Sequence, residues 1–127
     1  MDFAMRYDRS YRPLATVLGI GPKRTTIRVA DGTLHVKHGR VFAIDVPLSE
    51  IKSARVLPER PSGWGVHQFK DGWLIRGSRD GIVELTFGSR IKPKKVPGGG
   101  DWLASPVGAL YISLAEPDSF IAAVRPH

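Results

Sequence analysis

Residues 25–57 read TTIRVADGTLHVKHGRVFAIDVPLSEIKSARVL, and they carry the clearest structural signal in the chain. Apolar side chains recur in it at every second position: Ile27 and Val29, Leu34 and Val36, Ile44 and Val46. Because successive side chains of a strand point to opposite faces, a period of two predicts half-buried β-strands. We therefore expect the first half of the chain to form a β-meander.

Turn residues separate these apolar runs. Asp31-Gly32 lies between the first two runs, and this dipeptide favours the positive φ angles of a two-residue hairpin turn. His38-Gly39 is placed to close the next hairpin. Pro47 has no N–H to donate to a ladder, so the strand predicted over residues 48–57 should begin at a corner.

The second half of the chain also shows strand patterns, and it ends in a segment with a helix pattern. Strands are predicted over residues 64–69, 73–76, 82–87 and 107–114. Lys70-Asp71-Gly72 supplies a turn between the first two, and the connection 77–81 predicts a second hairpin between residues 73–76 and 82–87. Residues 116–119, Glu-Pro-Asp-Ser, suit the first turn of a helix, which Pro126 should end.

About seven strands followed by one short helix, with no long crossover, indicate a mainly β fold. We expect an antiparallel seven-stranded roll or partly open barrel, with the C-terminal helix closing its core. The length of 127 residues suits one domain spanning 1–127.

The amino-acid composition excludes several kinds of chemistry and indicates where the protein is located. The chain has no cysteine, which excludes disulfides and thiol chemistry. The N-terminus has no secretory apolar stretch, and the longest weakly polar run, residues 14–21, is too short to span a bilayer. We therefore expect a cytoplasmic protein, with a peripheral membrane location as the alternative.

The sequence does not predict an enzyme. The segment Gly19–Thr25 lacks the spacing of a phosphate loop, and the chain has no Gly-x-Ser-x-Gly elbow. His35 and His38 are three residues apart on a strand and turn, which should send them to opposite faces and disfavours a metal pair. We expect no catalytic residue, cofactor or metal.

Several motifs are similar to known proteins: Asp31–Leu34, Ile44–Ile51, Trp73–Ser78 and Glu116–Phe120, together with Arg12–Leu14 and Leu18–Pro22 near the N-terminus. Together they resemble a family of small uncharacterised bacterial proteins, largely actinobacterial, over nearly the whole chain. The first two motifs also resemble the opening strands of bacterial pleckstrin-homology-like domains. That resemblance implies a seven-stranded antiparallel barrel capped by a C-terminal helix, which serves as a binding platform for lipids, peptides or other subunits.

The basic excess gives one hypothesis. Lys plus Arg number 19 against 12 Asp plus Glu, a net charge of +7. Residues 90–101 form a predicted flexible loop, basic at its start and rich in glycine at its end. The candidate anion-binding residues are Lys23, Arg24, Arg40, Arg90, Lys92, Lys94 and Lys95. They could bind an anionic lipid surface or a phosphate-bearing ligand.

The three tryptophans, Trp64, Trp73 and Trp102, give the other hypothesis. Each can pack inside the barrel mouth or anchor a partner. They are not interleaved with basic residues, which disfavours a nucleic-acid groove. We favour a non-catalytic module for protein–protein interaction or self-association, and the anionic-surface binder is the alternative.

Overall fold

The computed structural model describes residues 1–7, 13, 24–39, 41–58, 65–78, 80–94 and 105–125. The strands within these ranges are β1 (Asp2–Phe3), β2 (Thr25–Ala30), β3 (Thr33–His38), β4 (Phe42–Pro47), β5 (Ile51–Val56), β6 (Gly65–Phe69), β7 (Gly72–Arg76), β8 (Ile82–Ile91) and β9 (Val107–Ser113). A 3-10 turn, η2 (Leu48–Glu50), precedes β5, and the helix α2 (Pro117–Val124) follows β9.

The predicted meander is confirmed for β2, β3 and β4, which form the first sheet with β1, but the strand predicted over residues 48–57 does not continue it, because β5 pairs with β8 of the second sheet. The order of the first sheet is β1-β2-β3-β4, and all its neighbours are antiparallel. Asp31 and Gly32 have φ angles of 53° and 71°, and Ala30 pairs with Thr33 across them. The two-residue turn predicted from Asp-Gly is therefore confirmed. β1 was not predicted, because a two-residue strand is too short to show a period.

The second sheet has the order β5-β8-β9-β7-β6, so the predicted hairpin between residues 73–76 and 82–87 is wrong. β9 lies between β7 and β8, parallel to the first and antiparallel to the second. Gly72 makes the parallel pairing possible, since a Cβ at this position would lie 1.8 Å from the carbonyl oxygen of Ala109. The turn before it is Lys70-Asp71, with φ of 50° at Lys70.

Two segments differ in their bounds from the sequence prediction. The strand predicted over residues 48–57 begins with η2, because Pro47 and Leu48 turn the chain before β5. In the flexible loop predicted over residues 90–101, Arg90 and Ile91 instead belong to β8, and the Lys94 N–H donates to the Ala43 carbonyl at 2.8 Å. Residues 95–101 lie outside the described ranges.

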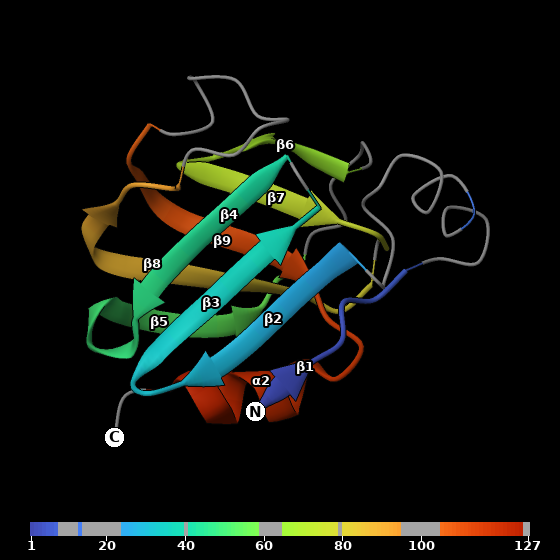
Figure 1. Ribbon diagram of the computed structural model, residues 1–127, viewed down its shortest axis with the longest axis horizontal. Coiled ribbons are helices and arrows are strands. Elements are labelled where there is room, and N and C mark those ends of the chain that lie inside the picture. Colours follow the sequence, from blue (N-terminus) through green and yellow to red (C-terminus); the bar gives the residue numbers. More distant parts are fainter. Residues whose placement is uncertain are drawn as a thin grey trace.

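The two sheets pack face to face, with β2, β3 and β4 crossing in front of the five-stranded sheet in Figure 1. The core between them contains Leu34, Ile44, Ile75, Leu85 and Ile112, all fully buried. Burial of this apolar surface supplies most of the stabilising free energy. Over the described residues the fold is mainly β, with two mostly antiparallel sheets, no closed barrel and one short C-terminal helix.

α2 lies at the lower end of the sheets in Figure 1. Pro117 occupies its first turn, as the sequence predicts, and Phe120 and Val124 are fully buried in the core. The Phe120 ring stands edge-on to Phe3, with centroids 5.3 Å apart. The prediction that this helix closes the core is therefore confirmed. No helix within the described ranges has the length and apolar character needed to cross a membrane.

Candidate functional site

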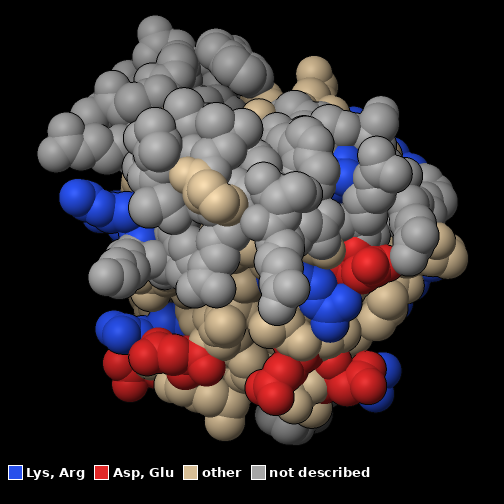
Figure 2. Space-filling model, turned by 90° about the vertical axis from the view of Figure 1, so that its right-hand side faces the viewer, with Lys and Arg blue, Asp and Glu red and all other residues tan. Residues whose placement is uncertain are grey.

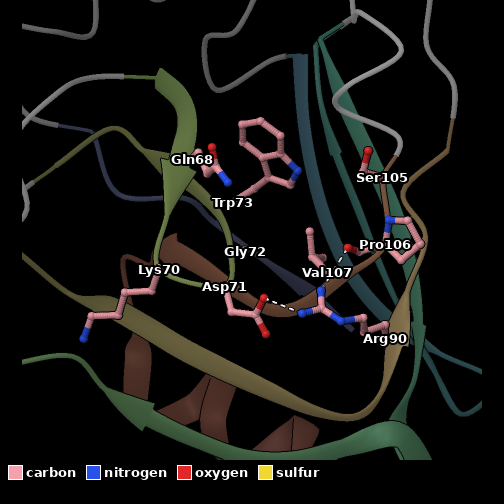
Figure 3. Close-up of a pocket in the computed structure, with 9 residues that line it drawn as sticks. All are labelled: Gln68, Lys70, Asp71, Gly72, Trp73, Arg90, Ser105, Pro106 and Val107. Atoms are coloured by element: carbon pink, nitrogen blue, oxygen red, sulfur yellow. Dashed lines mark hydrogen bonds and ion pairs between the residues drawn. The ribbon is translucent and has the colours of Figure 1, made fainter.

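A cavity of about 300 Å³ opens where the β6–β7 turn meets the start of β9 and the end of β8 (Figure 3). We call it the Arg90 cavity. Its lining residues are Gln68, Lys70, Asp71, Gly72, Trp73, Arg90, Ser105, Pro106 and Val107. The set combines a guanidinium, a carboxylate, an amide and a hydroxyl with an indole wall, so the cavity is more polar than a typical small-molecule site.

An ion pair forms one side of the Arg90 cavity. Arg90 Nη2 lies 2.7 Å from Asp71 Oδ1, and Arg90 Nη1 donates to the Pro106 carbonyl at 3.2 Å. Arg90 reaches both groups because β8 is long enough to bring it beside the β6–β7 turn and the residue before β9. The guanidinium therefore connects three segments that are distant in sequence.

The Asp71 end of this pair is held by its backbone. The Gly108 N–H donates to the Asp71 carbonyl at 3.1 Å. A Cβ at Gly108 would lie 2.3 Å from Asp71 Oδ2, so a larger residue there would displace the carboxylate. Glycine at 108 thus lets the turn sit directly against β9.

Trp73 forms the apolar wall. Its side chain is only 4% exposed and belongs to the main core, while Figure 3 shows its indole beside the cavity with Gln68 and Ser105 on either side. Trp73 is therefore anchored by packing and presents an edge to a ligand. Both roles considered from the sequence, core packing and partner contact, are compatible with this position. Trp64 and Trp102 lie outside the described residues.

Lys70 stands at the rim of the Arg90 cavity. Its ammonium lies 5.4 Å from the centroid of the Phe69 ring, a cation–π contact, and Figure 3 shows the side chain directed away from the cavity. Phe69 in turn stands edge-on to Tyr111, with centroids 4.9 Å apart. Lys70 therefore adds positive charge near the opening without filling it.

The described candidates for anion binding come from different parts of the fold. Arg24 precedes β2 on the first sheet, whereas Arg90 belongs to the second. Lys94 Nζ lies 2.6 Å from Asp45 Oδ2, so this cation, like Arg90, is paired with a carboxylate. Lys92 is exposed and has no ion pair within the described ranges. Lys23, Arg40 and Lys95 lie outside the described residues.

The carboxylate of Asp45 contacts two side chains. Besides Lys94, the His35 Nδ1 lies 2.8 Å from Asp45 Oδ1. Partial burial alone would raise the pKa of this carboxyl, but hydrogen bonds from Lys94 and His35 outweigh it and lower the pKa below its ordinary value. Asp45 is therefore ionised at neutral pH and neutralises part of the basic segment. Figure 2 likewise shows basic and acidic side chains intermixed on one face.

The two histidines on β3 point to opposite faces, as predicted. His35 is half-buried beside Asp45, whereas His38 is fully buried with its Nδ1 2.9 Å from Thr25 Oγ1. Desolvation lowers the pKa of His38 to about 4, so its ring is neutral at physiological pH. Among the residues that the structure describes, no group of three His, Cys, Asp or Glu side chains is placed to hold a metal ion.

Sequence reasoning missed Asp71, Gln68, Ser105 and Pro106 as site residues. Asp71 was visible as a turn residue, but the turn signal carries no information on what the side chain contacts. Its partner Arg90 was singled out only for its charge. The pairing depends on β9 lying beside β7, and this order is not encoded in any local pattern.

Comparisons of the chain with protein families, curated proteins and solved structures gave no match.

Proposed function

We propose that this protein is a non-catalytic binding module that recognises a protein partner through the Arg90 cavity. The observation that carries the proposal is the cavity itself, which is lined by an exposed, oriented arginine and by the edge of a buried tryptophan. Tryptophan and arginine are the residues that most often supply binding energy at protein interfaces. Trp73 is held by the core, so little side-chain entropy is lost when a partner packs against it.

The chemistry of the cavity supports recognition better than catalysis. Arg90 and Asp71 satisfy each other at 2.7 Å, and Ser105 supplies the hydroxyl among the lining residues. A hydrolytic site would place a nucleophile beside a base within hydrogen-bond reach. The described lining residues show no such pair, and their polar groups surround the opening as contact points for a ligand.

The anionic-surface alternative draws on the remaining basic residues. Arg90 and Lys94 are each paired with a carboxylate, which leaves Arg24 and Lys92 as the exposed candidates within the described ranges. A surface lysine or arginine contributes about 1 kcal/mol to binding an anionic membrane. Flotation with anionic and neutral liposomes at several salt concentrations tests this alternative. A salt-sensitive preference for anionic liposomes would support it over the partner-binding proposal.

We also propose that the fold is a variant of the pleckstrin-homology-like roll. The four-stranded first sheet and the helix that closes the core support this assignment. The parallel pairing of β7 with β9 departs from an antiparallel roll, and it creates the Arg90 cavity at one end. The partner site proposed here is therefore a feature of this chain rather than a property carried over from the resemblance.

Site-specific photocrosslinking tests the partner-binding proposal. A photoreactive residue replaces Gln68, which is exposed at the Arg90 cavity, and the matched control replaces Lys37, which is exposed on β3. In cells of the source organism we expect a discrete crosslinked protein from position 68 and none from position 37. Equal crosslinking from both positions, or none from position 68, would contradict the proposal.

Self-association is the second form of the proposal. If the partner is another copy of this chain, the crosslinked product from position 68 will have twice the mass of the monomer. Light scattering coupled to chromatography should then show a concentration-dependent dimer that Arg90→Ala weakens. A strict monomer at high concentration would assign the site to a different protein.

A further inference from the structure

We infer that the Arg90 cavity receives a carboxylate group of its partner, with Arg90 as the residue that binds it. The inference rests on the proposed function and names the chemistry that the partner must present. It is carried by the hydrogen-bond capacity of Arg90, by the way its side chain is held, and by the size and charge of the cavity.

Arg90 has more hydrogen-bond donors than its observed contacts use. A guanidinium carries five N–H groups, and within the described ranges Arg90 donates to Asp71 Oδ1 at 2.7 Å and to the Pro106 carbonyl at 3.2 Å. The side chain is 58% exposed, so the remaining donors can reach a ligand. The planar fork of arginine matches the two oxygens of a carboxylate.

The existing contacts orient Arg90 before any ligand arrives. Asp71 is fixed by the hydrogen bond that its carbonyl accepts from Gly108, and Pro106 leads directly into β9. A ligand therefore meets an arginine that has already lost much of its rotational freedom, which lowers the entropic cost of binding. Asp71 and Pro106 act here as positioning groups for the guanidinium.

The size of the cavity limits the ligand. A volume of about 300 Å³ is at the lower end of the range for small-molecule sites and leaves no room for a large cofactor. It suits one side chain or the end of a polypeptide. Trp73, Pro106 and Val107 offer apolar surface for the carbon atoms next to the carboxylate. An acidic side chain or a C-terminal residue has this combination of groups.

The charges favour an anion over a cation. Asp71 is balanced by Arg90, and Lys70 adds a further positive charge at the rim. A cationic group that approaches Asp71 would be repelled by the Arg90 guanidinium, which is already paired with that carboxylate. The net charge of +7 on the whole chain also favours the approach of anionic partners.

An NMR titration tests the inference with three acetylated peptides. The first is alanyl-leucyl-valine with a free C-terminal carboxylate, the second is the same peptide amidated, and the third is amidated with an internal glutamate. We expect saturable shifts of the Arg90 side-chain Nε–H and of the Gly72 and Gly108 amides with a carboxylate-bearing peptide. The second peptide, which is amidated and has no carboxylate, should bind at least about tenfold more weakly. Comparison of the first and third peptides identifies the source of the carboxylate.

Variants distinguish a specific role of Arg90 from the effect of removing any one positive charge from the surface. Arg90→Gln should weaken carboxylate binding at least about tenfold, and Arg90→Lys should restore some of it, since lysine keeps the charge but lacks the fork. Arg28→Gln is the matched control, because Arg28 also lies 2.7 Å from an aspartate, Asp2, and is 53% exposed. Asp71→Asn should strengthen binding, since asparagine keeps the Oδ1 acceptor that orients Arg90 but removes the competing negative charge.

Three results would overturn the inference: binding of the second peptide, which lacks a carboxylate, as tight as that of both carboxylate-bearing peptides; unchanged binding by Arg90→Gln; or loss of carboxylate binding in Asp71→Asn with a preserved spectrum. The titration is independent of the crosslinking at position 68. A partner captured there without any carboxylate preference removes this inference and keeps the proposed function. Carboxylate binding without capture removes the proposed protein partner and keeps the carboxylate site.

Discussion

The ammonium group of Lys94 lies 2.6 Å from a carboxylate oxygen of Asp45. Asp45 belongs to β4 of the first sheet, whereas Lys94 follows β8 of the second. The Lys94 N–H also donates to the Ala43 carbonyl at 2.8 Å, so the chain that leaves β8 is bound to the edge of the opposite sheet. Arg90 lies shortly before this attachment, and the attachment therefore limits the movement of one side of the Arg90 cavity.

Lys94→Met should loosen this attachment. The pair is partly exposed, so we expect a loss of about 0.5–1 kcal/mol in the free energy of unfolding, measured with urea. Hydrogen exchange of the Lys94 amide should become faster, since its bond to Ala43 is no longer supported by the side chain. Lys92→Met is the control, because Lys92 has no ion pair within the described ranges. An equal effect of both substitutions would show that the ion pair with Asp45 contributes nothing.

Gly72→Ala should destabilise the second sheet. A Cβ there would lie 1.8 Å from the Ala109 carbonyl oxygen, and a backbone atom cannot move away without breaking the parallel pairing of β7 with β9. We expect a loss of at least about 3 kcal/mol in urea unfolding, the upper end for overpacked sites. Gly88→Ala is the control, since the nearest atom to its Cβ would be 3.7 Å away. A stable Gly72→Ala variant would mean that the strand order differs from the one described.

Strands β2, β3 and β4 of the first sheet were predictable because their signals are local, whereas β1 and the pairing of β5 with the second sheet were not. The period of two in residues 25–57 and the Asp31-Gly32 turn both act over a few residues, and adjacent strands of a meander pair with each other. α2 was predictable for the same reason, from Pro117 in its first turn and the apolar spacing of Phe120 and Val124.

The second sheet and the cavity were not predictable in the same way. The insertion of β9 between β7 and β8 is decided by contacts between residues far apart in sequence, such as Gly72 with Ala109. The ion pair of Arg90 with Asp71 follows from that insertion. The sequence indicated Arg90, Lys92 and Lys94 as one basic group, but only the fold shows that carboxylates pair with Arg90 and Lys94.

Phe120→Ala should release α2 from the core. The side chain is fully buried and stands edge-on to Phe3, so its removal costs both apolar burial and a ring contact. We expect a loss of about 3–5 kcal/mol in urea unfolding. Ser119→Ala, at an exposed neighbouring position, should change stability by less than about 0.5 kcal/mol. Similar values for the two variants would contradict the role of this helix in closing the core.

The free energy of unfolding should rise between pH 4 and pH 6.5 because of His38. Burial lowers the pKa of His38 from 6.5 to about 4, so within this window the unfolded chain binds a proton that the folded protein excludes. The free energy of unfolding therefore increases with pH in this window and levels off above the pKa of the histidine in the unfolded chain. The difference between the folded and unfolded pKa values of His38 corresponds to a rise of about 3 kcal/mol in the free energy of unfolding. Asp45, whose pKa is lowered, loses its contribution only as the pH falls below its ordinary value of 3.8, outside this window.

Urea unfolding at intervals of half a pH unit measures this rise, and a non-titrating variant identifies its source. His38→Gln keeps a polar group next to Thr25 but binds no proton, so its stability should change little across the same window. His35→Gln leaves His38 in place and should retain the rise. If His38→Gln shows the same slope as the unmodified protein, another group must be responsible and His38 must be protonated without cost in the folded state.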